Sequence, residues 1–83
     1  MRKSTHSPEY AILRQHLLTT RQSAGLSQRE LARLLSVTAS WVSKVETGER
    51  RLDLVEFYWF CSACKKDPIA AAKAVYHTMR RQA

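Results

Sequence analysis

The chain has 83 residues, with 14 lysines and arginines against 7 aspartates and glutamates and a formal net charge of +7. This length leaves room for one domain with one modest core and little space for an enzyme cleft, while the excess positive charge is typical of proteins that bind phosphate groups. No apolar run is long enough to span a bilayer and residues 1–3 lack the apolar segment of a secretion signal, so we expect a cytoplasmic protein with no membrane partner.

The first helix is predicted from about Pro8 to Ala24. Ser7 is a suitable N-cap, proline fits the first helical position, and Gly25 can end the helix. Three residues are spaced to line a core, namely Tyr10, Leu13 and Leu17. Residues 1–7 are polar and without periodicity, and we expect them to form a flexible tail.

Residues 27–48 predict two short helices joined by a tight turn. Ser27 and Glu30 have the spacing of a capping box, which starts the first of these helices at Gln28. Its apolar side consists of Leu31, Ala32 and Leu35. Helices this short are marginal in isolation, so we expect both to depend on packing against each other.

The turn and the second short helix follow directly. Ser36 and Val37 are expected to form the turn, Thr38 is the next N-cap, and a helix from Ala39 to Thr47 would stop at Gly48.

The second short helix has two unlike faces. At about 100° per residue, Val42 and Val45 fall on one side. The opposite side carries Ala39, Ser40, Ser43 and Lys44. The valines are expected to face the core, and the other four to form a shallow, mildly basic ridge that can approach a DNA major groove. The alternative is an ordinary amphipathic helix with a solvated polar face.

Two further helices complete the pattern. Asp53 and Glu56 repeat the capping box and open a fourth helix. Its recurring apolar face is expected to be buried and contains Leu54, Phe57, Phe60, Cys61 and Cys64. A fifth helix is predicted from about Pro68 to Arg80. Its apolar stripe contains Ile69, Ala72, Tyr76 and Met79. The expected fold class is therefore all-α, with five helices and no strand.

Cys61 and Cys64 have the spacing of a Cys-x-x-Cys motif, but we interpret them as core thiols. The three histidines are scattered, so a tetrahedral zinc site lacks further ligands. A redox pair would normally begin a helix, whereas these cysteines fall in its last turns. No Ser, His and carboxylate grouping and no glycine-rich phosphate loop is present, so we expect neither an enzyme nor a cofactor or metal.

The stretch from Gly25 to Gly48 resembles the helix-turn-helix domains of the phage repressor and Cro type. The positions that carry the resemblance are Leu26, Ser27, Gln28, Leu31, Ala32, Val42, Val45, Glu46 and Gly48. The resemblance implies a compact five-helix bundle that binds double-stranded DNA. It divides the chain into a DNA-binding domain at 8–67, with the motif at about 27–48, and a C-terminal helix at 68–83 as a candidate dimerisation element.

In similar domains the second short helix faces DNA, and its neighbours hold phosphates. By that resemblance and by residue chemistry, the expected DNA-binding residues are Gln28, Thr38, Ala39, Ser40, Trp41, Ser43, Lys44, Arg50 and Arg51. Lys44 is expected to contact guanine, Gln28 a phosphate, and Arg50 and Arg51 further phosphates. Trp41 either packs on the protein, which we favour, or lies over the DNA backbone.

Resembling domains also pair a helix-one arginine with the glutamate near the end of the second short helix. Arg21 and Glu46 match those positions, so we expect an ion pair that orients this helix. Removing one partner would be costly if the pair is buried.

The C-terminal helices carry more large apolar residues than one small bundle obviously covers. A homodimer interface is expected to include Tyr58, Trp59, Val75, Tyr76 and Met79. The alternative is that the fifth helix folds back and buries these side chains within one chain.

The expected function is a sequence-specific transcriptional regulator, a repressor of phage, plasmid or restriction-system type that binds a palindromic operator as a homodimer. The alternative is a protein-interaction module, such as an antitoxin or accessory factor, that uses the aromatic C-terminal helices. A thiol redox enzyme based on Cys61 and Cys64 is a remote third hypothesis. No small-molecule effector can be named from the residues.

Overall fold

The computed structural model describes residues 6–82, which form five α-helices and no strand, as the sequence predicts. The helices are α1 (Pro8–Ser23), α2 (Gln28–Leu35), α3 (Ala39–Thr47), α4 (Leu54–Ala63) and α5 (Pro68–Gln82). Residues 1–5 of the expected tail lie outside the described residues, whereas Ser7 is the N-cap of α1.

The first four helices begin at the predicted caps. Side-chain oxygens accept hydrogen bonds from the backbone N–H three residues later at Ser7, Ser27, Thr38 and Asp53. Ser27 and Asp53 form complete capping boxes, because Glu30 and Glu56 accept from their backbone N–H groups at 2.9 and 3.0 Å. Each cap satisfies donors that a helix start would otherwise leave unpaired.

The turn between α2 and α3 depends on one residue in the left-handed region. Ser36 has φ 57° and ψ 42°, which allows the Val37 N–H to donate to the Ala32 carbonyl at 3.0 Å. This bond closes α2 in the manner of a Schellman motif. Gly48 ends α3 with φ 85°, a conformation that costs glycine little.

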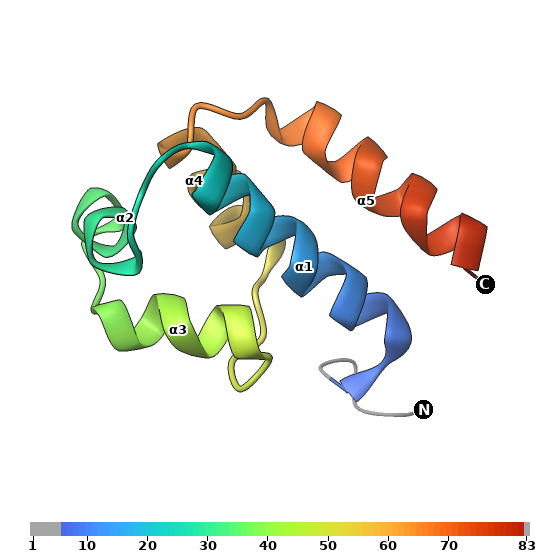
Figure 1. Ribbon diagram of the computed structural model, residues 1–83, viewed down its shortest axis with the longest axis horizontal. Coiled ribbons are helices and arrows are strands. Elements are labelled where there is room, and N and C mark those ends of the chain that lie inside the picture. Colours follow the sequence, from blue (N-terminus) through green and yellow to red (C-terminus); the bar gives the residue numbers. More distant parts are fainter. Residues whose placement is uncertain (1–5, 83) are drawn as a thin grey trace.

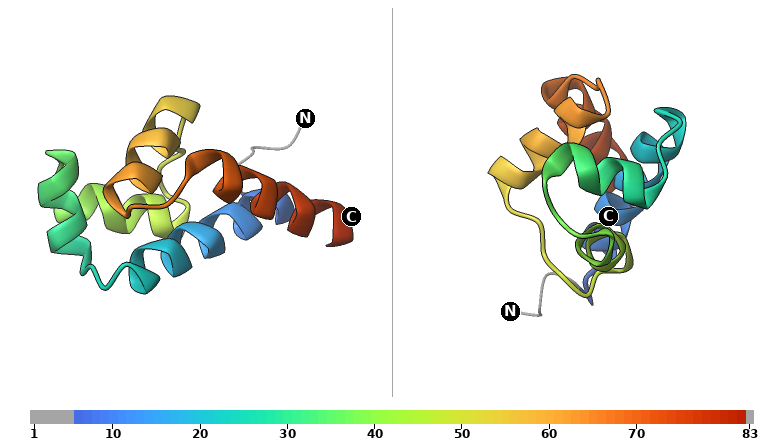
Figure 2. Two further views of the ribbon diagram at one scale, coloured as in Figure 1. Left: turned by 90° about the horizontal axis from the view of Figure 1, so that it is seen from above. Right: turned by 90° about the vertical axis from the view of Figure 1, so that its left-hand side faces the viewer.

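The helices surround one core. α2 packs against α3, and α1 packs against α3, α4 and α5. α3 lies along one edge of the molecule and α5 along the opposite edge (Figure 1), while the view from above shows α5 running beside α1 (Figure 2). The fully buried centre consists of Leu17, Leu31, Val42, Val45, Phe60 and Cys61.

The loop between α3 and α4 is attached to α1. The backbone N–H of Leu52 donates to the Tyr10 hydroxyl oxygen at 2.6 Å, and Leu52 itself is buried in the core. This contact gives Tyr10 a polar partner inside the bundle and fixes the loop that follows the second helix of the motif.

Two expectations about the apolar faces are wrong. Leu54 is 81% exposed rather than buried, because it occupies the first position of α4, where no neighbouring helix covers it. In α5 the buried stripe is Ala71 and Val75, so Ile69 and Tyr76 remain exposed. The other two residues of the predicted stripe, Ala72 and Met79, are half-buried, since α5 turns its smaller residues towards α1 and α4.

No helix within residues 6–82 is long and apolar enough to cross a bilayer.

Candidate nucleic-acid interface

The two faces of α3 are arranged as the helical spacing predicts. Val42 and Val45 are both 0% exposed and belong to the central core cluster. On the opposite side Ala39, Ser40 and Lys44 are exposed, and Ser43 is half-buried. Because α3 lies at an edge of the molecule, this polar face is not covered by the rest of the described chain (Figure 1).

Thr38 holds the start of this face. Its Oγ1 accepts from the Trp41 backbone N–H at 3.0 Å, and the residue is exposed. The cap uses the hydroxyl only as an acceptor, so its O–H can still donate to a phosphate oxygen.

α3 is fixed to α1 by the expected ion pair. Arg21 Nε lies 2.7 Å from Glu46 Oε2, and Nη2 donates to Oε1 at 3.1 Å. The third nitrogen, Nη1, donates to the Leu26 carbonyl at 2.8 Å. The side chains are only 11% and 4% exposed. All three guanidinium nitrogens therefore bond within the protein, and Arg21 orients α3 rather than standing at the surface.

Gln28 joins the same network. Its Nε2 donates to Glu46 Oε1 at 3.0 Å, which places the first residue of α2 against the last turn of α3. An amide nitrogen has two hydrogens, so one donor remains for a phosphate. The Glu46 carboxylate opposes the dipole of α3, and its three hydrogen bonds from Arg21 and Gln28 compensate for that position.

Arg50, expected to bind a phosphate, has partners within the protein. Its Nη1 and Nη2 donate to the two carboxylate oxygens of Glu56 at 3.2 and 3.0 Å, and Nη1 also donates to the Arg51 carbonyl. The guanidinium carbon lies 4.9 Å from the centre of the Trp41 ring, within cation–π range. Arg50 thus connects α3 to the beginning of α4.

Of the two arrangements left open for Trp41, the structure has the packed one. Its ring is half-buried, packs against the core cluster and lies beneath the Arg50 guanidinium. Arg51, the next residue, is exposed.

The Arg50–Glu56 pair also changes the electrostatics of α4. The guanidinium hydrogen bonds lower the pKa of the Glu56 carboxyl, and the Asp53 backbone N–H lowers it further. Glu56 therefore stays ionised and serves two donors at once, the N-cap backbone of its own helix and the arginine of the preceding loop.

The residues expected at a dimer interface do not share one face. Val75 is only 6% exposed, because α5 turns it towards the rest of its own chain, so it offers little surface to a second copy. Trp59 borders a hollow between α2 and α4 with Leu34 and Leu35, whereas Tyr58 borders a groove between α4 and α5. The physical reason is that consecutive helical residues point about 100° apart. α5 does fold back, yet it leaves Tyr58 and Tyr76 exposed.

The groove between α4 and α5, called the α4/α5 groove below, is almost entirely apolar. It has a volume of about 550 Å³ and is lined by Leu54, Val55, Phe57, Tyr58, Pro68, Ile69, Ala72, Lys73 and Tyr76. Met79 lines an adjoining hollow that shares Leu54, Phe57, Ala72 and Tyr76 with the groove. Of the five exposed large apolar residues that line the groove, three were not expected at an interface, namely Leu54, Val55 and Ile69.

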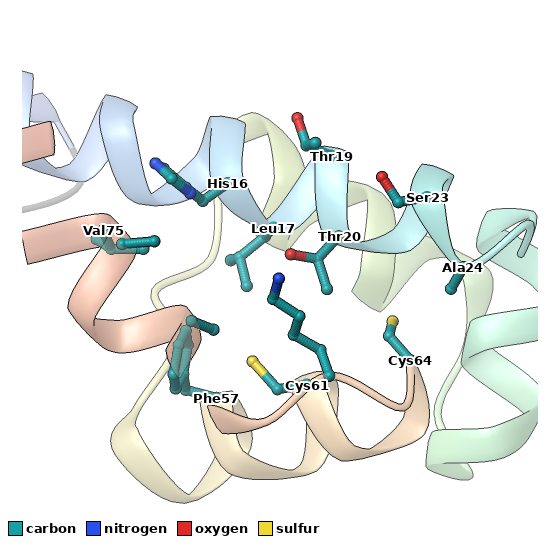
Figure 3. Close-up of a pocket in the computed structure, with 13 residues that line it drawn as sticks. His16, Leu17, Thr19, Thr20, Ser23, Ala24, Phe57, Cys61, Cys64 and Val75 are labelled. Atoms are coloured by element: carbon teal, nitrogen blue, oxygen red, sulfur yellow. The ribbon is translucent and has the colours of Figure 1, made fainter. Parts of the chain in front are cut away.

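The two cysteines border a separate cavity of about 420 Å³ between α1, α4 and α5. Leu17 and Thr20 of α1 point across this cavity towards Cys61 and Cys64 (Figure 3). Burial raises the pKa of Cys61 to about 11 and also raises the pKa of Cys64. Both are free, buried thiols, and no three potential metal-ligating side chains lie together in the described part of the chain.

Arg14 was not among the residues expected at this interface. Its Nε is buried without a hydrogen-bond partner, and the residue borders a crevice with Thr47, Gly48 and Glu49 at the end of α3. Nothing in the spacing of α1 marks this arginine, because only the crossing of α1 over α3 brings it to the loop.

Comparison with protein families shows which family has this arrangement of helices. The model of a family described as "Helix-turn-helix domain" matches residues 12–72, which contain α2, α3 and the ion-pair residues. The chain belongs to the helix-turn-helix domain family. The fold and the family together place this helix-turn-helix domain among the DNA-binding transcription regulators, and the positions it shares with the Cro and phage-repressor type occupy the predicted places in α2 and α3.

Solved structures agree with this assignment. An XRE-family-like protein from Pseudomonas syringae pv. tomato str. DC3000 is 41% identical, with a TM-score of 0.83 over 88% of this chain and 89% of that one. The clp gene regulator ClgR from Corynebacterium glutamicum has a TM-score of 0.78 at 21% identity, over 92% of this chain and 81% of that one, and supports the fold alone. Comparison with curated proteins found no match.

Proposed function

We propose that this helix-turn-helix domain is a sequence-specific transcriptional repressor that binds a palindromic operator as a homodimer. The observation that carries the proposal is the division of α3, with two valines fully buried and Ala39, Ser40 and Lys44 exposed on the outer side. A helix held from beneath in this way can enter a major groove without losing its own packing. The repressor assignment, of phage, plasmid or restriction-system type, rests on the resemblance to phage repressors and Cro.

The residues of α3 would read bases. Lys44 carries the only long cationic side chain of α3 and is proposed to contact guanine O6 and N7. Ala39 can contact a thymine methyl group, and Ser40 adds a weakly selective hydroxyl. With few direct contacts, selectivity also draws on DNA shape and on the use of two half-sites.

Phosphate contacts would surround the reading helix. The N-terminus of α2 presents backbone amides, and Gln28 retains one amide hydrogen beside them. Thr38 and Ser43 offer hydroxyls, and Arg51 is exposed in the loop after α3. We propose that these groups set the register of α3 on the duplex without selecting sequence.

The α4/α5 groove is the proposed dimer surface. It gathers five exposed large apolar residues, Leu54, Val55, Tyr58, Ile69 and Tyr76. Large contiguous apolar patches on small domains commonly mark interaction sites. A twofold contact here would give each copy one free α3, and the two copies could then read half-sites about 34 Å apart.

The test is selection of bound sequences from a random DNA pool, followed by affinity measurement. The proposal expects enriched inverted repeats, and Lys44→Ala should weaken binding of the selected site by about 1 to 3 kcal/mol. Arg80→Ala is the matched control, since it removes one exposed positive charge from the last turn of α5. Absence of any enriched sequence would end the proposal, and enrichment of single, unrepeated sites would end its dimeric part.

A second candidate function is protein interaction, as in an antitoxin or accessory factor. The hollow between α2 and α4 favours it, because Leu34 and Trp59 are exposed there and lie apart from the α4/α5 groove. A protein that binds no DNA from the random pool, yet loses a partner when Trp59 is replaced by Ala, would support this function over the first.

A further inference from the structure

In the loop after α3, Arg50 is held by a carboxylate of the same chain, which accepts from it through both oxygens. Glu56 Oε1 and Oε2 lie 3.2 and 3.0 Å from the two terminal nitrogens of Arg50. A phosphate group would approach the same nitrogens, since carboxylate and phosphate both suit the planar guanidinium fork. Glu56 and a DNA phosphate are therefore alternative partners for one cation.

The exposure of this pair indicates that the exchange can occur. The Arg50 side chain is 39% exposed and that of Glu56 is 16% exposed, whereas the Arg21–Glu46 pair is almost completely covered. Partly hydrated ion pairs contribute little to stability, so their partners can separate at small cost. Arg50 can leave Glu56 at small cost. If Arg21 left Glu46, it would leave a buried carboxylate without its charged partner, which is costly.

Glu56 would not be left unsupported by the exchange. Its Oε1 also accepts from the Asp53 backbone N–H at 3.0 Å, as part of the capping box that starts α4. The carboxylate therefore keeps a hydrogen bond when the guanidinium turns away. The position of Arg50 over Trp41, whose backbone N–H is bonded to the Thr38 cap, keeps the guanidinium at the flank of α3.

We propose that Glu56 is a specificity-determining residue for DNA binding, because it competes with phosphates for Arg50. On unrelated DNA the carboxylate keeps the guanidinium, which removes one sequence-independent contact. On the operator, where α3 seats fully in the groove, a phosphate is held against the loop long enough to replace the carboxylate. The inference rests on the DNA-binding function proposed above and adds a residue to it that touches no base.

The test compares Glu56→Gln with wild type on a selected operator and on random-sequence duplex over a salt series. Glutamine keeps an oxygen for the Asp53 N–H but gives up the charge that holds Arg50. On random DNA the variant should bind roughly three- to tenfold more tightly at about 50 mM salt, and its log–log salt slope should steepen by about 0.9. On the operator the slope should not change, so the ratio of specific to random affinity falls.

Two controls separate this exchange from a simple loss of negative charge. Glu49→Gln removes an exposed carboxylate from the same loop and should leave the salt slope unchanged. In an Arg50→Ala background, Glu56→Gln should no longer steepen the slope on random DNA. Circular dichroism at each salt concentration checks that the variants remain folded.

The outcomes are distinct. Equal effects of Glu49→Gln and Glu56→Gln, or an effect of Glu56→Gln that persists without Arg50, would overturn the competition while leaving the DNA-binding function intact. A wild-type protein that binds no DNA at any salt concentration would instead overturn the function, and this inference with it.

Discussion

Arg21 and Arg50 show how the surroundings of a side chain decide its role. Both are arginines that bond to a glutamate through two nitrogens. The Arg21 pair is covered, so it contributes to orientation of α3 and must stay intact; the Arg50 pair is partly hydrated and can open. Their different burial, which the sequence does not display, assigns one to the fold and the other to the proposed interface.

Loss of the buried Arg21–Glu46 ion pair should destabilise the folded protein. Arg21→Met keeps most of the side-chain length but leaves the Glu46 carboxylate in the core with only the Gln28 donor. We expect the free energy of unfolding to fall by about 3 to 5 kcal/mol. Urea denaturation followed by circular dichroism measures this change.

The matched control is Arg33→Met, which removes an exposed arginine from α2. This substitution should change the free energy of unfolding by less than about 0.5 kcal/mol. Equal effects of the two substitutions would show that the Arg21–Glu46 pair has no special weight.

The thiols of Cys61 and Cys64 should react slowly in the folded protein. Cys61 is almost completely buried, and the raised pKa of both thiols leaves little reactive thiolate at pH 8. Neither should react rapidly with a chromogenic disulfide reagent in the native protein, whereas both should react in guanidinium. Rapid reaction of the native thiols would revive the redox hypothesis.

At the level of helices, the α2–α3 turn contains strain that a single change can relieve. Ser36 adopts φ 57°, a conformation that costs most residues other than glycine roughly 1 to 2 kcal/mol. The residue is exposed, so its side chain can be removed without opening the core. The turn nevertheless keeps α2 and α3 at the angle on which the motif depends.

Ser36→Gly should therefore raise the free energy of unfolding by about 1 kcal/mol, less what glycine loses through a more flexible unfolded chain. Thermal denaturation measures the difference. Ser62→Gly, at an exposed helical position of α4, is the opposite control and should lower the free energy of unfolding by about 0.5 kcal/mol. A destabilised Ser36→Gly variant would mean that the serine side chain itself supports the turn.

At the level of the whole molecule, two surfaces lie on different sides of one small bundle. α3 lies along one edge, and the α4/α5 groove is formed on another side by helices that do not belong to the motif (Figure 1). This separation allows a second copy to occupy the groove while α3 remains free. A dimer of this kind links oligomeric state to DNA affinity.

Ile69→Asp should convert the proposed dimer to a monomer, because it places a charge in an apolar groove at a position that is 68% exposed in one chain. Sedimentation equilibrium measures the change. Leu34→Asp introduces the same charge in the α2/α4 hollow and should leave the dimer intact. Wild-type protein that sediments as a monomer at high concentration would remove the basis for the prediction.

The sequence by itself determined the helices and the outward face of α3. Caps act over three residues, and helical periodicity acts over one or two turns. Local signals were therefore sufficient to place the ends of α2 and α3 and the buried side of α3. These signals are Ser27 with Glu30, Thr38, Gly48 and the spacing of Val42 and Val45. Tertiary structure alone decided which apolar and charged side chains met partners. It turned Ala71 and Val75 of α5 inwards, separated Trp59 from Tyr58, exposed Leu54 and placed Glu56 beside Arg50. These outcomes depend on how whole helices cross, and local spacing does not encode the crossing of segments that are distant in the chain.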